Sequence, residues 1–333
     1  MRVIRVLATA AGSLLLVVGT VGVAAHFSGL VSTTATLIAS FTPLLLLAVL
    51  AALVLLLIGG QRLLVVLAAV VLAVGVWTQW LLFHAASTST TAAAAEPARM
   101  PSVRTMQANI FLGGADADAL VAQIRAESVD VLTVVELTEP AVERLAAAGV
   151  GDGLPYSFIR PRGGGGGIGI YSRHPLSDGE LLDGFALNNV RATLTVPGAQ
   201  PHAIYALHPL PPYPEPSWRW ASELDRLHGI LGSETRPLIV GADFNSTFDH
   251  KRFRELLAGA GGSDAPALID AAAHLGSGIV ATYPANRRIP AVLAIDRILT
   301  RGATPTSFRR IDIVGSDHHG VIGDVRLATA DRR

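Results

Sequence analysis

The stretch Leu238-Ile-Val-Gly-Ala-Asp-Phe-Asn-Ser-Thr247 decides our interpretation of the fold, because two polar residues, Asp243 and Asn245, directly follow a short apolar run. Such a run predicts a buried strand, and polar residues at strand ends can converge on one cleft from distant parts of a sequence. A single acid at a strand end is most often a cap or a turn residue, but five other runs end in the same way. The polar residues that follow those runs are Asn109, Glu136, His208, Asp296, and the pair Asp317 and His318.

Short apolar runs alternate with a few helical stretches through the C-terminal two thirds of the chain. Many strands with few helices between them predict an α/β fold in which helices cover two packed sheets. The predicted helices are Ala115–Glu127, Pro140–Ala148 and Pro216–Leu231. The predicted strands are Val103–Ile110, Val129–Val135, Tyr156–Ile159, Ile168–Tyr171, Val190–Val196, His202–Leu207, Leu238–Val240, Leu293–Leu299 and Val321–Val325.

The side chains gathered at the strand ends are carboxylates, carboxamides and imidazoles, and the chain contains no cysteine. Hard oxygen ligands without thiolates suit Mg²⁺ or Mn²⁺ better than structural zinc. A divalent cation screens the charge of a phosphoester, while a carboxylate orients the attacking water and an imidazole donates to the phosphoryl group. This inventory predicts a metal-dependent phosphoric ester hydrolase.

Seven short motifs follow one another through the same region. They are Met106-Gln-Ala-Asn-Ile110, Val134-Val-Glu-Leu137, Tyr171-Ser-Arg-His-Pro-Leu176, Ala206-Leu-His-Pro209, Gly241-Ala-Asp-Phe-Asn-Ser-Thr247, Ile295-Asp-Arg-Ile-Leu299 and Gly315-Ser-Asp-His-His-Gly320. In this order they resemble the endonuclease/exonuclease/phosphatase superfamily, over residues 103–327. The resemblance implies the DNase I-like fold, a four-layer α/β/β/α sandwich. With its apolar N-terminal region, the chain also resembles actinomycete membrane proteins linked to resistance against teicoplanin, a glycopeptide antibiotic.

The resemblance to the superfamily implies a metal site built on three residues of this chain. Glu136 looks like the principal metal carboxylate, and Asn109 looks like a second polar group beside the metal. Asp317, next to the last motif's histidine, is expected to support the ion. The cofactor implied by the resemblance is Mg²⁺ or Mn²⁺.

The same resemblance implies five catalytic residues. Asp243 is expected to align and deprotonate the attacking water, and Asn245 to hold a phosphate oxygen. His318 would donate to the phosphoryl group, while Asp296 would fix its tautomer and favour its cationic form. His208 resembles a second histidine near the leaving group.

Substrate-binding residues are less defined than the catalytic ones. Arg160 and Arg162 are candidates because guanidinium groups pair well with phosphate, and Trp218 is a candidate because it follows a proline-rich loop. Some nucleases of the superfamily place a carboxylate that partners the second histidine near Gly163–Gly167. This chain offers only the two arginines there, so the partner of His208 is left open.

The N-terminal region contains three apolar stretches, each with the roughly 20 residues that a membrane-spanning helix needs. They cover about residues 6–25, 36–58 and 63–83. A cleaved signal peptide would explain the first stretch, but not the other two. We therefore predict three transmembrane helices within residues 1–84, a linker at residues 85–102 and a catalytic domain at residues 103–333.

The basic residues of this region predict its orientation in the membrane. Arg2 and Arg5 precede the first stretch, Arg62 lies between the second and third, and the loop His26–Ala35 carries no Lys or Arg. Because positive residues favour the cytoplasmic side, we expect the N-terminus in the cytoplasm. An odd number of spans then places the catalytic domain on the extracellular face of the cell membrane.

The distribution of charge bears on the substrate. All 26 acidic residues lie from Glu96 onward, with all but three of the 26 basic residues, so this region has a net charge of −3. Nucleic-acid binding usually requires a basic surface. We therefore favour a phosphorylated lipid or a lipid-linked cell-wall intermediate as substrate over nucleic acid. The alternatives are an extracellular nuclease and a catalytically inactive binding module, and the sequence defines no oligomeric state.

Overall fold

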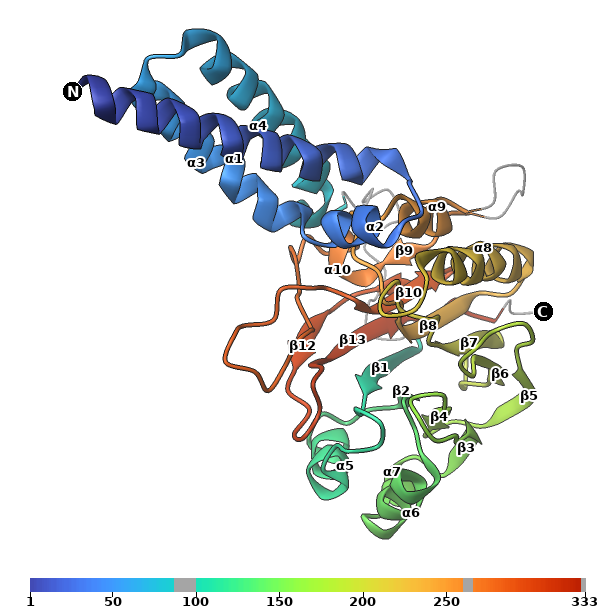
Figure 1. The fold of residues 1–333 in the computed structure, drawn as a ribbon. Coiled ribbons are helices and arrows are strands. Elements are labelled where there is room, and N and C mark those ends of the chain that lie inside the picture. The colour runs from blue at the N-terminus through green and yellow to red at the C-terminus, as the bar shows by residue number, and fades with distance from the viewer. Residues whose placement is uncertain (87–99, 260–265, 331–333) are drawn as a thin grey trace.

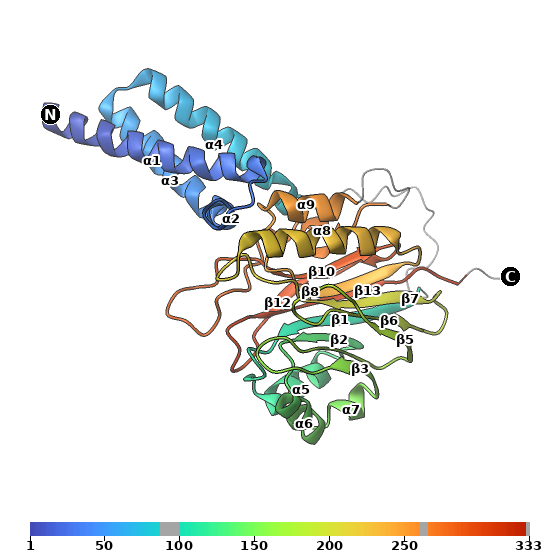
Figure 2. The ribbon, with the colours of Figure 1, turned by 45° about the vertical axis from the view of Figure 1, so that its right-hand side comes forward.

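The computed structural model describes residues 1–86, 100–259 and 266–330, which form a helical bundle joined to an α/β sandwich (Figure 1). The sandwich has four layers, with two sheets packed face to face and helices on both outer sides (Figure 2). The predicted fold is confirmed: two mixed sheets follow three long apolar N-terminal helices.

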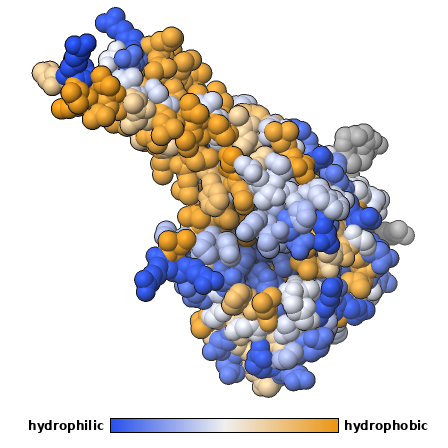
Figure 3. Space-filling view, in the orientation of Figure 1, coloured by the Kyte–Doolittle hydropathy of each residue, from blue (hydrophilic) through white to orange (hydrophobic). Residues whose placement is uncertain are grey.

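The bundle consists of α1 (Arg2–Ser28), α3 (Thr42–Gly59) and α4 (Arg62–Phe83). Each is long and apolar enough to cross a membrane. Leu, Val and Ala side chains cover most of the outer surface of the bundle, which is hydrophobic over nearly all of the face shown in Figure 3. An exposed apolar surface of this extent marks a site of contact with a membrane or another protein, and the length of these helices suits a membrane.

The predicted second span is divided into two helices. A short helix, α2 (Thr33–Ser40), precedes α3, which begins at Thr42 and not at Thr36. Pro43 lies in the first turn of α3, where its missing N–H costs nothing, whereas a continuous helix would make its ring clash with the preceding turn. As a result, α2 lies across the end of the bundle, beside the sandwich (Figure 1).

The N-terminus and the turn between α3 and α4 lie at the end of the bundle that points away from the sandwich (Figure 1). Arg2, Arg5 and Arg62 therefore share one end, as the predicted orientation requires. The structure contains no membrane, so the orientation itself stays a prediction. Most of the predicted linker, residues 87–99, lies outside the described residues.

The first sheet has the strand order β11-β13-β1-β2-β4-β3, with β12 paired to β13. Only β1 and β2 run parallel, and the other pairs are antiparallel. The strands are β1 (Ser102–Asn109), β2 (Val131–Val135), β3 (Tyr156–Arg160), β4 (Ile168–Ser172), β11 (Thr304–Pro305), β12 (Arg309–Ile311) and β13 (Gly320–Arg326).

The second sheet has the order β5-β6-β7-β8-β10-β9, in which only β7 and β8 run parallel. Asp243 ends β8 and pairs in register with Asp296, the first residue of β10. This antiparallel pairing brings two predicted site residues together from distant parts of the sequence. The strands are β5 (Leu176–Leu181), β6 (Val190–Leu194), β7 (His202–Leu207), β8 (Leu238–Asp243), β9 (Ile269–Asp270) and β10 (Asp296–Arg301).

Helices close the sandwich on its two outer faces (Figure 2). The helices α5 (Ala117–Ala126), α6 (Glu139–Ala147) and α7 (Val150–Gly153) cover the first sheet. The second sheet is covered by α8 (Ser217–Ser233), α9 (Lys251–Ala258) and α10 (Ala271–His274), of which only α8 was predicted. The short strands β5, β9, β11 and β12 were also missed, because their side chains are largely exposed or their runs too brief to form an apolar pattern.

Buried polar contacts join the bundle to the sandwich. Asp249, in the loop between β8 and α9, has its Oδ1 2.7 Å from Nδ1 of His26 in α1. The same oxygen accepts a hydrogen bond of 2.8 Å from Nε2 of Gln79 in α4. Because all three side chains are buried, the contact holds the ends of two bundle helices on a loop of the catalytic domain.

Candidate active site

Asn109, Glu136 and Asp243 meet between the two sheets. Asn109 ends β1, Glu136 directly follows β2, and Asp243 ends β8. The amide Nδ2 of Asn109 donates to Glu136 Oε1 over 3.1 Å and to Asp243 Oδ2 over 3.2 Å. Three of the predicted site residues thus share one hydrogen-bond network across both sheets.

The backbone is left-handed at two of the predicted residues. The angle φ is 61° at Glu136 and 49° at Asn245, which is uncommon for residues other than glycine. The N–H of Leu112 donates to Glu136 Oε2 over 2.5 Å, and the N–H of Asn245 donates to Asp243 Oδ1 over 2.8 Å. Strained backbone of this kind clusters at functional sites, where surrounding contacts hold it.

A buried histidine–carboxylate pair lies beside Asp243. Nδ1 of His318 is 2.9 Å from Asp296 Oδ2 and 3.7 Å from Asp243 Oδ2. Burial lowers the pKa of His318, but the two neighbouring carboxylates outweigh this effect and raise that pKa to about 10. Burial also raises the pKa of Asp296. The imidazole is therefore cationic at neutral pH and can donate a hydrogen bond through Nε2.

Three residues that the sequence did not single out position this pair. Ser316 Oγ donates to the backbone at the end of β1 over 2.7 Å and accepts from the N–H of His318 over 3.0 Å. Thr282 Oγ1 accepts from the N–H of Asp296 over 3.3 Å. The ring of Tyr283 packs on the His318 ring, with centroids 4.8 Å apart. Such residues are common in loops, so only their tertiary contacts reveal their role.

His208 also reaches this network, but without a carboxylate partner of its own. Its Nε2 lies 3.7 Å from Asp243 Oδ2. Its backbone N–H donates to Asn189 Oδ1 over 2.7 Å, whereas its buried Nδ1 has no hydrogen-bond partner among the described residues. Asn189, another residue that the sequence did not indicate, therefore positions the backbone and not the ring of His208.

An open pocket of about 800 Å³ lies over these side chains. Asn109 and Asp296 are fully buried behind its surface. The predicted site residues that line it are Glu136, His208, Asp243, Asn245, Asp317 and His318. We call the set Glu136, Asp243, Asp317 and His318 the acidic floor.

Another side of the pocket belongs to the membrane bundle. Leu37 and Ser40 of α2, together with Phe41, line the same pocket as the acidic floor. We call these three residues the α2 wall. Next to them lies the proline-rich segment that follows His208, from Leu210 to Glu215. The candidate site residues therefore open toward a surface that is partly built by α2.

The three substrate-binding candidates lie elsewhere. Within the described part of the chain, none of them is among the pocket-lining residues. The guanidinium of Arg160 lies over the Phe158 ring, 4.2 Å from its centroid, and Arg162 donates to the carbonyl of Ala186 over 2.8 Å. Trp218 is 65% exposed on α8. A role for these residues in substrate binding stays a prediction.

The donor set fits a divalent cation. The carboxyl groups of Glu136, Asp243 and Asp317 line the same pocket as His318, whose Nδ1 lies 2.9 Å from Asp296 Oδ2, and burial raises the pKa of Asp317. This excess of acidic groups would repel a phosphate anion unless a cation were also bound. Ligand atoms of Asp243, Asp296 and His318 lie within 4.8 Å of one another, close enough to share a metal ion.

Solved structures with the same fold support this description. The chain is similar to humanised D. rerio TDP2, with a TM-score of 0.56 and 18% identity over 67% of this chain and 98% of that one. For D. rerio TDP2 in complex with a single-strand DNA product, the TM-score is 0.55 and the identity 19%, over 67% of this chain and 98% of that one. For an endonuclease/exonuclease/phosphatase from Bacteroides vulgatus, the TM-score is 0.50 and the identity 18%, over 68% of this chain and 99% of that one. At these identities the likeness shows the fold alone.

A family comparison identifies the chain more specifically than the fold does. No curated protein matches the sequence. The model of the endonuclease/exonuclease/phosphatase family, however, matches residues 106–318, which begin within β1 and end at His318. With the buried acidic and histidine cluster between the two sheets, this match shows that the chain belongs to the endonuclease/exonuclease/phosphatase family of metal-dependent phosphoesterases.

Proposed function

We propose that this protein hydrolyses a phosphorylated lipid or a lipid-linked cell-wall intermediate at the extracellular face of the cell membrane. One observation carries the choice of substrate: the pocket combines the acidic floor of the catalytic domain with the α2 wall of the bundle. A pocket shared in this way suits a substrate whose phosphate group lies at the bilayer surface. The extracellular placement rests on Arg2, Arg5 and Arg62.

In this proposal, Glu136 and Asn109 hold Mg²⁺ or Mn²⁺, and Asp317 supports the ion. A bound divalent cation screens the phosphate charge and stabilises the charge that develops during hydrolysis. We place the ion beside Glu136 and not against His318, because Nδ1 of His318 is already engaged by Asp296 Oδ2, 2.9 Å away.

The remaining residues act on water and on the phosphoryl group. Asp243 orients the water and accepts its proton, and Asn245 holds a phosphate oxygen. Asp296 engages Nδ1 of His318, which leaves Nε2 to donate to the phosphoryl group. His208, whose Nε2 lies 3.7 Å from Asp243 Oδ2, would act near the leaving group.

The alternative, an extracellular nuclease, draws support from the D. rerio TDP2 structure that contains a single-strand DNA product. Two features of this chain favour the lipid. The region from Glu96 onward has a net charge of −3, and the arginine candidates lie outside the pocket. Proteins that bind DNA gain most of their affinity from basic side chains that contact the phosphate backbone of the DNA.

A contribution to teicoplanin resistance stays a prediction from the sequence resemblance. Hydrolysis of a lipid-linked cell-wall intermediate would be the chemical route to such a phenotype. The enzymatic proposal does not depend on it.

The test of the proposal is an assay of the full chain in detergent micelles with Mg²⁺. We expect phosphate release from a polyprenyl pyrophosphate, loss of this activity in His318→Ala, and little nicking of plasmid DNA. DNA cleavage that His318→Ala abolishes, without lipid turnover, would establish the nuclease instead. Failure to cleave any phosphoester would favour the inactive binding module.

The orientation has its own test. A topology reporter fused after Arg333 should be active only outside the cytoplasm. Activity confined to the cytoplasm would overturn the extracellular placement and leave the chemistry of the site unaffected.

A further inference from the structure

We propose that Leu37 and Phe41 bind the first part of the substrate's hydrocarbon chain, and that α3 leads the rest of this chain from the pocket into the bilayer. The inference rests on the proposed function, because it assumes a lipid phosphoester. It adds the route of the chain and predicts that the enzyme selects its substrates by chain length.

The first support is the position of the two side chains. Leu37 and Phe41 line the same pocket as Glu136 and His318, although they come from the opposite part of the molecule. Phe41 is 37% exposed, so that its ring is available to a ligand. Apolar groups at one side of a pocket and charged groups at its base match a molecule with an apolar chain and an anionic head.

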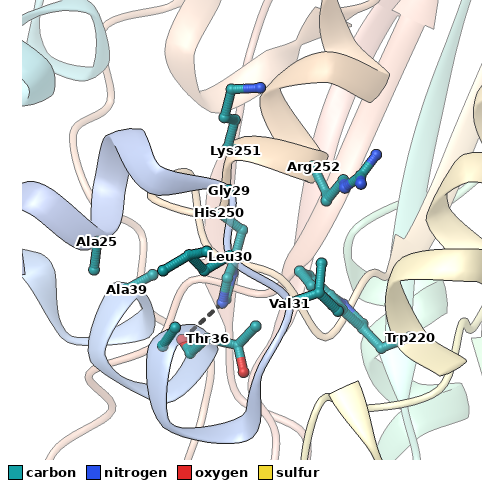
Figure 4. Close-up of a pocket in the computed structure, with 11 residues that line it drawn as sticks. Ala25, Gly29, Leu30, Val31, Thr36, Ala39, Trp220, His250, Lys251 and Arg252 are labelled. Carbon is teal, nitrogen blue, oxygen red and sulfur yellow. Dashed lines mark hydrogen bonds between the residues drawn. The ribbon is translucent and has the colours of Figure 1, made fainter. Parts of the chain in front are cut away.

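The second support is that α2 is fixed to the catalytic domain. His250 accepts a hydrogen bond from the N–H of Thr247 at Nδ1, over 3.0 Å, which leaves Nε2 to donate to the carbonyl of Thr36, also over 3.0 Å. Figure 4 shows this contact, with Trp220 beside the histidine; the ring centroids are 5.0 Å apart. Trp220 Nε1 in turn donates to Ser246 Oγ over 3.0 Å.

These contacts connect α2 to the segment that directly follows Asn245. Thr36 Oγ1 also lies 3.3 Å from Ser217 Oγ at the start of α8. A helix held at both α8 and the loop before α9 keeps its position relative to the acidic floor. The α2 wall is therefore a built part of the site and not a loose connection between two spans.

The third support is the surface that continues from Phe41. Leu44 and Leu47 follow at intervals of three residues, which makes them neighbours on the surface of α3. They are 44% and 61% exposed on the outside of the bundle. A hydrocarbon chain that passes Phe41 would therefore meet apolar side chains continuously until it reaches the membrane interior.

The energetic consequence is a dependence on chain length. Each methylene moved from water into the bilayer is worth about 0.8 kcal/mol, so a long chain keeps its headgroup at the membrane beside α3, whereas a substrate with a short chain also approaches from solution. A pyrophosphate with a short chain would fill the pocket beside Leu37 but gain little from α3. The full chain should therefore prefer long polyprenyl pyrophosphates to farnesyl pyrophosphate.

The experiment compares kcat/KM of the full-length protein for a long polyprenyl pyrophosphate and for farnesyl pyrophosphate. Phe41→Ala should lower the ratio of the two values about ten-fold, the effect of roughly 1.4 kcal/mol of lost contact. The matched control is Leu57→Ala, at the far end of α3, where Leu57 is 60% exposed; it should leave the ratio unchanged. An unchanged ratio in Phe41→Ala would overturn the proposal.

A measurement without a substitution covers the case in which Phe41→Ala fails to fold. A polyprenyl pyrophosphate with a photoreactive group near its head should crosslink the unmodified protein between Leu37 and Leu47. Adducts found only on other bundle residues would overturn the route. If the protein hydrolyses polyprenyl pyrophosphates but shows neither the change of ratio in Phe41→Ala nor the crosslink, the proposed function stands and this inference fails. Hydrolysis of DNA alone would instead refute the proposed function.

Discussion

The acidic floor and the α2 wall enclose one pocket, but they differ in origin, chemistry and support. The floor comes from strand ends and loops of the catalytic domain, carries carboxylates and an imidazolium, and is held by hydrogen bonds between the two sheets. The wall comes from the junction of two bundle helices, offers Leu37, Ser40 and Phe41, and is held through His250.

The difference teaches that, under the two proposals, reaction and substrate selection depend on separate parts of this molecule. In the proposed function, the acidic floor and a bound divalent cation together supply the groups for phosphoester hydrolysis. In the further inference, the α2 wall contributes no group that reacts, but it selects the phosphoesters that approach from the membrane side. Substitutions in the two regions should therefore change different measured quantities.

The largest expected effect is on the acidic floor. His318→Ala should lower kcat roughly 10²–10⁴-fold, because it removes the cationic donor to the phosphoryl group. The matched control, His319→Ala, removes the neighbouring imidazole, which does not line the pocket in the described structure, and should retain turnover. Equal losses of kcat in both variants would show that activity depends on the structure of the loop and not on the imidazolium of His318. This result would contradict the chemical role of the acidic floor.

The joint between bundle and catalytic domain should give the next largest effect, on stability. Asp249→Ala leaves His26 and Gln79 buried without their acceptor and should lower the free energy of unfolding by about 3–5 kcal/mol. The control Asp225→Ala breaks an exposed ion pair with Arg252 and should cost less than about 1 kcal/mol. Thermal unfolding in detergent measures both. Similar losses would mean that the joint contributes no more than a surface pair.

The attachment of the α2 wall should depend on pH. Burial lowers the pKa of His250 to about 4, well below its usual value near 6.5. The buried neutral imidazole of His250 therefore contributes its full stabilisation above pH 6.5. As the pH falls toward 4, the free energy of unfolding decreases by roughly 3 kcal/mol in total. His250→Gln should remove this slope, whereas His174→Gln, in the turn after β4, should keep it. The free energy of unfolding is measured between pH 4 and 7. The same dependence on pH in His250→Gln as in the unsubstituted protein would contradict the assignment to His250.

Metal binding should show the smallest of these effects. Glu136→Gln should raise the Mg²⁺ concentration required for half-maximal activity about 10–100-fold, because it removes the carboxylate expected to hold the ion. Chelation should abolish activity without unfolding the chain, since the acidic floor lies over a complete apolar core. An unchanged Mg²⁺ requirement would contradict metal binding by Glu136 and would favour the group formed by Asp243, Asp296 and His318 as the metal site.

The acidic floor could be predicted because its signal is local. A polar residue at the end of an apolar run marks a strand end, and Glu136 and Asp243 show this pattern. His318 instead lies in the loop between β12 and β13. The order of the motifs then indicated the fold, which the two sheets confirm. Register pairing between strands distant in sequence, such as Asp243 of β8 opposite Asp296 of β10, is a consequence of topology and needed the structure.

The α2 wall could not be predicted, because the sequence around it is uniformly apolar. Residues 36–58 read as one span, and only the position of Pro43 in a first helical turn reveals the break. The contact of Thr36 with His250 joins residues 214 positions apart. Positioning residues such as Ser316 were missed for a related reason: a hydroxyl in a loop has no pattern until its partners are known.

The most direct test of the account is whether the substrate reaches the acidic floor from the bilayer. The full chain is reconstituted into vesicles, and a polyprenyl pyrophosphate is held at constant bulk concentration while inert phospholipid dilutes it within the membrane. We predict that the rate of phosphate release falls in proportion to the surface fraction of substrate. A rate that follows only the bulk concentration, or cleavage of added DNA without lipid turnover, would contradict a membrane phosphoesterase that takes its substrate past the α2 wall.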